Sequence, residues 1–281
     1  MHKSYYVALM QKHLLCFFYL MCLTLITKAE EPENGQFKAL PKKRWINTFT
    51  ADSRAHRLSM AKNFDQKSWN ASMGGIMPVL NFKIGSLPFQ WSIAGATYLT
   101  LQRANGAGAV INTDFFGDTW IDAEIASQWF VRLGTGHSSQ HLSDDAILLG
   151  LAFRNYAKDY HFAGLVYQNS MHMFQAYGLA YYNYNFKTST DLSGSWLFQT
   201  GFEHSVFKVS DKLNLFYAID IKLREEHRFE PTLNAQIGCK AIDFKGDAIR
   251  IALDQTIGKE ERGSFMYQNR NFVRLAIYLD F

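Results

Sequence analysis

The sequence predicts an all-β protein: an antiparallel transmembrane β-barrel of about twelve strands, preceded by a short N-terminal periplasmic segment. Three observations predict this fold: a hydrophobic leader, a period of two in hydrophobicity over most of the chain, and a closing strand that alternates to its last residue. Of the 281 residues, 15% are aromatic and only five are prolines. This composition favours alternating strands over a helical bundle, because a barrel in lipid needs only every second residue to be apolar.

Residues 1–29 are predicted to be a signal peptide. Basic residues precede an unbroken apolar run over residues 14–26, and Ala29 is a small residue at which cleavage can occur. The run is too short to span a bilayer as a helix. We therefore expect export and cleavage after Ala29, and the alternatives are a buried helix or a short membrane anchor.

Removal of the leader changes what the charge and the cysteines imply. The leader carries three lysines and no acid, so the net charge falls from +4 to +1. Nothing in this balance favours a nucleic-acid partner. Cys239 is the one cysteine that remains and cannot form an internal disulfide. We interpret it as a small apolar side chain on a strand.

Residues 30–71 are predicted to form a periplasmic N-terminal extension, since their first part is charged, contains two prolines and shows no sustained period. The barrel is predicted to occupy residues 72–281. Its turns are marked by Gly, Ser and Asp, and an even strand number returns both termini to the periplasm. The predicted strands are 72–84, 89–102, 109–116, 120–134, 145–157, 160–170, 175–187, 192–207, 212–224, 232–242, 247–257 and 268–281.

The faces opposite the apolar ones predict a narrow lumen. In the predicted strand 212–224, Asp220 and Lys222 face away from the apolar side chains, and Arg250 and Asp254 do the same in strand 247–257. Charges of both signs favour a closed lumen with salt bridges over a wide pore. A barrel of twelve strands has a lumen that its own side chains can nearly fill.

The closing strand, residues 271–281, resembles the sorting signal of bacterial outer-membrane β-barrels. Its resemblance implies that the barrel-assembly machinery reads this strand, that the protein lies in the cell outer membrane, and that outer-membrane lipid and lipopolysaccharide surround it. The residues that carry the signal alternate up to the C-terminus: Val273, Leu275, Ile277, Leu279 and Phe281.

Residues 134–145 are the strongest candidate for a catalytic or binding site, because two histidines, three serines and two carboxylates lie close together in the sequence there. If the parity of the preceding strand continues, His137 and Ser139 face outward. The parity of the predicted strand 145–157 turns Asp145 outward as well. A base, a hydroxyl and a carboxylate are therefore predicted to meet on the outside of the wall.

This His-x-Ser arrangement resembles the site of outer-membrane phospholipase A and the lipid A deacylase barrels. The resemblance implies that His137 is the base, Ser139 the nucleophile and Asp145 the residue that orients the histidine. The strand count places this loop between the fourth and fifth strands, on the periplasmic side, whereas such lipases act on the outer leaflet.

Two other interpretations of the same residues stay open. One is a hydrogen-bonded turn whose histidines lie at the level of the lipid headgroups. The other is a metal site made by His137, His141 and either Asp144 or Asp145.

Three segments resemble successive landmarks of a bacterial domain-of-unknown-function family of outer-membrane barrels: ADSRAHRLS at 51–59, GGIMPVLNF at 74–82 and HSSQHLSDD at 137–145. The resemblance implies the fold and the location and brings no established activity. Three functions are therefore considered. The preferred one is a structural or interaction barrel with a narrow lumen, and the alternatives are a lipid acyl hydrolase and a small-solute channel. No cofactor is expected, no metal is assigned, and the oligomeric state is left open.

Overall fold

The computed structural model describes residues 37–64, 67–104, 107–153, 156–169, 173–188, 194–210, 213–242, 248–261 and 263–280. The chain divides into two compact units, 1–38 and 39–281, and of the first unit only Phe37 and Lys38 are described. The predicted signal peptide and Phe281 of the predicted sorting signal lie outside the described residues. Within the described part, no helix is long and apolar enough to cross a membrane.

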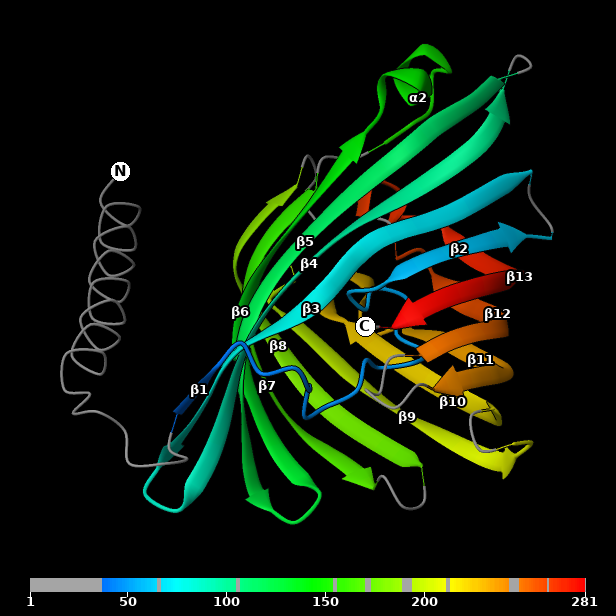
Figure 1. The fold of residues 1–281 in the computed structure, drawn as a ribbon. Helices are drawn as coiled ribbons and strands as arrows, with labels where there is room; N and C mark the ends of the chain where they lie inside the picture. The colour runs from blue at the N-terminus through cyan, green and yellow to red at the C-terminus, as the bar shows by residue number, and fades with distance from the viewer. Residues whose placement is uncertain are drawn as a thin grey trace, which may run out of the picture. The chain divides into compact units, whose positions relative to one another are not determined.

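Twelve antiparallel strands of the second unit close into a barrel (Figure 1). The barrel closes because its last strand, β13, pairs with its first strand, β2, so that Ala276 lies opposite Ala61. The predicted fold class is thus confirmed. The strands are β2 (Leu58–Asn63), β3 (Ser68–Ile84), β4 (Leu87–Ala104), β5 (Ala107–Ala126), β6 (Trp129–Leu142), β7 (Tyr156–Asn169), β8 (Phe174–Thr188), β9 (Trp196–Lys208), β10 (Leu213–Arg224), β11 (Pro231–Ile242), β12 (Ala248–Lys259) and β13 (Asn269–Asp280), with β1 (Phe37–Ala39) as an additional short strand at the end of the strand order.

The strand count of twelve is right because two local errors cancel. The predicted strand 145–157 is wrong: it holds most of a short helix, α2 (Asp144–Leu148), and only the first residues of β7. Ser143 caps this helix by accepting from Ala146 N, and two acidic residues occupy the first turn. The missing strand is β2, so the barrel begins at Leu58 rather than at residue 72.

A second correction concerns the hairpin that carries the candidate residues. The predicted break at Gly117 is absent, because β5 continues to Ala126 and turns at residues 127–128, where Gln128 has a φ of 70°. The predicted loop over residues 135–144 is mostly the second half of β6. Gly117 pairs with Gly95 and His137 inside the sheet, so glycine marks no turn here.

The two ends of the barrel differ. At the end where β2 begins and β13 finishes, the chain reverses in short turns such as 85–86 and 127–128. The opposite end carries the connections that contain α2 and two 3₁₀ helices, η1 (Glu225–His227) and η2 (Gly263–Phe265). Short turns on the side of the termini and longer loops on the other side are typical of outer-membrane barrels.

The outer face of the wall is largely apolar, whereas its inner face buries polar and charged side chains beside an apolar cluster that includes Phe130 and Phe162. Burial alternates strictly along β12, where Ile251 and Leu253 are exposed outside and Arg250 and Asp254 are buried inside. The inward charges are paired: Arg250 Nε lies 2.5 Å from Asp280 Oδ2. Because unpaired buried charges are costly, these ion pairs are needed for the lumen to be closed.

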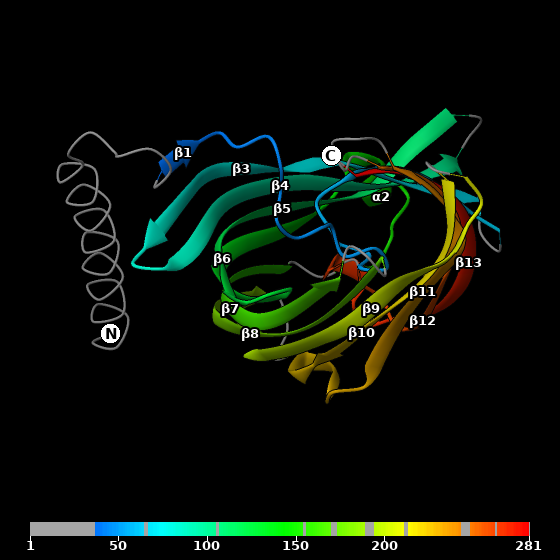
Figure 2. The same cartoon turned by 60° about the horizontal axis from the view of Figure 1, so that its bottom comes forward.

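Residues 41–57, which precede β2, form a plug inside the barrel (Figure 2). Two glutamines of the wall hold the plug backbone from different strands. Gln90 of β4 accepts from Trp45 N at 2.9 Å and donates to Lys43 O at 3.0 Å. Gln168 of β7 accepts from Asn47 N at 2.9 Å and donates to Trp45 O at 2.8 Å. The plug therefore satisfies polar side chains of the wall that would otherwise face an empty lumen.

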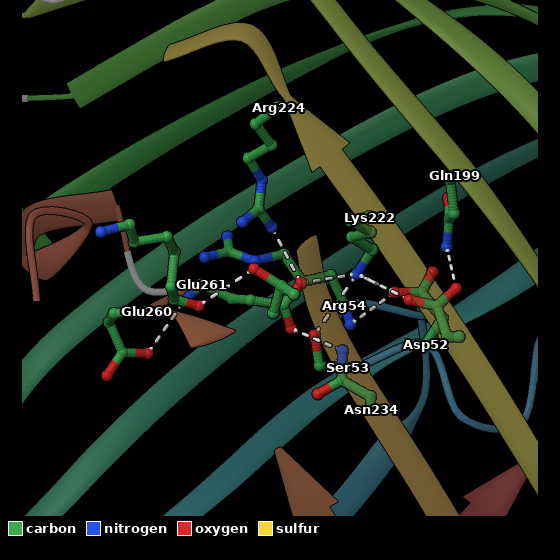
Figure 3. A network of polar contacts seen from close by, with 12 residues as sticks. Asp52, Ser53, Arg54, Gln199, Lys222, Arg224, Asn234, Glu260 and Glu261 are labelled. Carbon is green, nitrogen blue, oxygen red and sulfur yellow. Dashed lines mark hydrogen bonds and ion pairs between the residues drawn. The ribbon is translucent and has the colours of Figure 1, made fainter. Parts of the chain in front are cut away.

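A pair of stacked rings and a group of ion pairs complete the attachment of the plug. The ion pairs, here called the Lys222 latch, join Lys222 to Asp52 and Glu261. Phe49 of the plug stacks on Tyr177 with ring centroids 3.7 Å apart. Lys222 of β10 lies 2.6 Å from Asp52 of the plug and 2.9 Å from Glu261, which lies between β12 and η2 (Figure 3). Burial would raise the pKa of the Glu261 carboxyl, but Lys222 and Arg224 outweigh this effect and hold that pKa well below its ordinary range. Lys222 thus joins plug, wall and loop.

We predict that Lys222→Ala loosens the plug. The change leaves the Asp52 and Glu261 carboxylates buried without their shared cation, and breaking a buried pair in this way costs roughly 3–5 kcal/mol. In planar bilayers, the variant should show greater conductance than the wild type, whose lumen holds the plug. Lys83→Ala, an exposed lysine on β3, is the control. Equal conductance of the wild type and Lys222→Ala, with equal protection of the plug from protease, would contradict this prediction.

Candidate active site

A histidine, a serine and a carboxylate share the outer face of β6 and β7. The register places His137 of β6 directly opposite Asp159 of β7. His137 Nδ1 lies 2.6 Å from Asp159 Oδ1, and the two side chains are 55% and 27% exposed. Ser139 follows two residues later on β6 and so lies on the same face. The group is therefore accessible from outside the barrel and not from the lumen.

A third strand extends this contact. Asn185 of β8 is the register partner of Asp159 and donates Nδ2 to Asp159 Oδ2 at 2.6 Å. The register shifts beside Asp159, where Tyr184 is an extra residue in β8. Because a bulge of one residue reverses the parity of a strand, it turns Asn185 to the same side as Asp159. Both oxygens of the Asp159 carboxylate thus have a partner on a neighbouring strand.

Further polar residues surround the three side chains. His161 Nδ1 lies 3.1 Å from Thr135 Oγ1, and the His161 ring stacks on Tyr184 with centroids 4.5 Å apart. On β6 the outer face is apolar from Trp129 to Leu133 and polar from Thr135 onward. The outer polar patch consists of Thr135, His137, Ser139, Asp159, His161, Tyr184 and Asn185.

On the outer face there is free space beside His137, whereas the inner face of the wall next to His137 is closely packed. On the β5 side His137 faces Gly117, where an added Cβ would meet no atom within 4 Å. At Gly136, which faces the lumen, a Cβ would collide with the Asp118 carboxylate and the Tyr160 ring. His56 of the plug lies 3.1 Å from the same Asp118 carboxylate. The plug thus supports from inside the part of the wall that carries the site outside.

The structure brings together two of the three residues predicted for this site. His137 and Ser139 share the outer face as expected. Asp145 does not join them: it belongs to α2, and its Oδ2 accepts from Val110 N at 3.0 Å. The carboxylate beside His137 is instead Asp159. Sequence reasoning missed it because residues 145–157 were assigned to a strand, although Ser143 followed by Asp144 is a recognisable helix start.

The metal interpretation finds no support in the described ranges. Among those residues, no three His, Cys, Asp or Glu side chains gather at one point. His141, which was considered as a ligand, packs edge-on against Phe115 with ring centroids 5.7 Å apart.

The corrected strand order also changes the side of the barrel on which the patch lies. β6 is the fifth strand of the closed barrel, counted from β2, and it runs toward α2. His137 and Ser139 occupy the half of β6 nearer to α2, away from the end where β13 finishes. The expectation that they lie on the side of the chain termini is wrong, because it counted from residue 72 and omitted β2.

The family follows from the sequence match. Residues 22–281 match the family model described as "Protein of unknown function (DUF1207)". The chain belongs to the DUF1207 family. A search of curated proteins finds no match for it.

Solved structures share the fold of this DUF1207 protein. The dimer of outer membrane phospholipase from Salmonella typhi with bound calcium is 13% identical with a TM-score of 0.55, over 84% of this chain and 94% of that chain. Outer membrane phospholipase A from Escherichia coli is 11% identical with a TM-score of 0.54, over 80% of this chain and 96% of that chain. At these identities the likeness shows a common barrel fold of the outer-membrane type.

Proposed function

We propose that this DUF1207 protein is an outer-membrane lipid acyl hydrolase in which Ser139 is the nucleophile, His137 the general base and Asp159 the residue that orients His137. The observation that carries this proposal is the 2.6 Å contact between His137 Nδ1 and Asp159 Oδ1 on the outer face. With Nδ1 donating to the carboxylate, the free lone pair of the imidazole lies on Nε2, as a general base requires.

The place of the patch points to a lipid substrate. In an outer-membrane barrel the outer wall faces hydrocarbon, where an arginine or lysine costs about 2–4 kcal/mol at the midplane and about 0–1 kcal/mol near the interfaces, and a carboxylate costs less. The patch begins directly beyond Leu133 and lies toward the loop end, so we place it at the outer leaflet, near the ester groups of a lipid. Ionisable residues in such a position are functional candidates by default.

The reaction needs only groups that the chain and water supply. Ser139 Oγ attacks the ester carbonyl carbon while its proton passes to His137 Nε2. When the ester C–O bond breaks, His137 gives this proton to the leaving alcohol oxygen, which leaves an acyl-serine. Water then attacks the acyl carbon and gives a proton to His137, which returns it to Ser139 as the fatty acid leaves. Asp159 stabilises the imidazolium in both steps.

Two further observations favour this function over the alternatives. The structural neighbours are named as phospholipases, so this barrel shape is compatible with lipid hydrolysis. The plug inside the lumen favours the hydrolase over a solute channel. The proposal includes export through the signal peptide, assembly by the barrel-assembly machinery, and contact with outer-membrane lipid and lipopolysaccharide.

We predict that Ser139→Ala and His137→Ala each lower hydrolysis of a phospholipid or lipid A ester by at least about 10³-fold, since loss of either group disables a catalytic unit. The measurement is fatty-acid release by the purified barrel in detergent. Ser138→Ala is a matched control, because the neighbouring Ser138 is buried on the inner face.

The same assay separates the two carboxylates. Asp159→Ala should lower the rate by up to about 10⁴-fold, the loss expected when the carboxylate that orients a catalytic histidine is removed. Asp145→Ala should leave the rate unchanged, because Asp145 is hydrogen-bonded to the β5 backbone instead. Wild-type activity that survives both Ser139→Ala and His137→Ala would refute the proposed function.

We predict that Gly117→Leu also lowers hydrolysis, by roughly 10²-fold, because a side chain there occupies the open space beside His137 and displaces the ester. The barrel should still fold, since a Cβ at Gly117 meets no atom within 4 Å. Gly108→Leu is the control: it lies on the same strand in equally open space, away from the patch. Equal activity of the two variants would contradict the prediction.

A further inference from the structure

We propose that Asn185 is a positioning residue, which holds the Asp159 carboxylate in the orientation that His137 requires. This inference rests on the proposed function and adds a fourth residue, from a third strand, to the catalytic group. Asn185 touches neither Ser139 nor His137 in any described contact, and it acts through Asp159.

The Asp159 carboxylate is divided between two partners. Asp159 Oδ1 faces His137 Nδ1 at 2.6 Å, and Asp159 Oδ2 receives the Asn185 amide at 2.6 Å. A carboxylate held by one bond can rotate about its side-chain torsions, whereas two bonds on opposite oxygens fix its plane. Without Asn185, the partly exposed Asp159 can turn toward solvent and leave the imidazole tautomer undetermined.

A strand irregularity in β8 brings Asn185 to this position. Without the extra residue Tyr184, the alternation of β8 would turn residue 185 inward, since Asn183 is buried on the inner side. A bulge interrupts a ladder of hydrogen bonds, and bulges occur often beside active sites, where they redirect a side chain. This bulge is held in place by the stacking of Tyr184 on His161.

The side-chain amide of Asn185 is chemically suited to hold this carboxylate. An amide nitrogen donates to a carboxylate without adding charge, so it fixes Asp159 and leaves its negative charge available to His137. A basic residue at position 185 would compete with His137 for that charge. The nearest lysine on β8, Lys187, lies two residues further along the strand and interacts with the Asp159 carboxylate through its charge.

The test compares three variants in the full-length barrel. Asn185→Asp keeps the shape of the side chain but replaces the donor by a second carboxylate, and Asn185→Leu keeps the bulk without a donor. Both should lower kcat for phospholipid hydrolysis by about 10- to 100-fold and leave KM unchanged. This is the loss typical when a hydrogen-bond partner that orients a functional side chain is removed, as measured at metal sites. Asn269→Asp adds the same charge at an exposed position on β13 and should match the wild type.

Heat-modifiable migration on a denaturing gel shows whether each barrel is folded. A kcat like that of the wild type in folded Asn185→Asp and Asn185→Leu would overturn the positioning role while the proposed function stands. A loss that appears only as a raised KM, or only as a smaller folded fraction, would also overturn it. Absence of hydrolysis by the wild type would overturn both proposals.

Discussion

The closed hydrogen-bonded ring of strands is the constraint on which the rest of the structure depends. Because β13 pairs with β2, the strands close into a ring, and each side chain of the wall points either outward or into the lumen. The outward positions are mostly apolar, so the charged side chains gather inside and must find partners there. The plug, the paired charges of the wall and the Lys222 latch supply those partners.

The same alternation explains how much of the fold could be predicted. Strands such as β12, with a strict period of two, are evident in the sequence. β2 is short and shows no clean alternation, so it was missed. α2 was mistaken for a strand because Ile147, Leu149 and Leu151 happen to alternate. The plug shows no period in hydrophobicity. Its backbone is hydrogen-bonded to side chains of the wall and not to a neighbouring strand, so its own sequence need not alternate.

The candidate site could be predicted only along one strand. Parity within β6 places His137 and Ser139 on one face, which needs no knowledge of the neighbours. The position of Asp159 beside His137 is set by the register between β6 and β7, which are joined by a connection that contains a helix. The outward orientation of Asn185 is set by the bulge in β8. No local pattern reports a register or a bulge, so both residues emerge only from the structure.

The proposed hydrolysis requires Ser139 to be an activated nucleophile on the lipid-facing side of the wall. Covalent labelling of the purified barrel by an alkyl fluorophosphonate, with the modified residue identified by peptide mass spectrometry, tests this directly. We expect one label, on Ser139, whose rate of attachment falls sharply in His137→Ala. Absence of labelling in the folded wild type, or labelling that persists in Ser139→Ala, would contradict it.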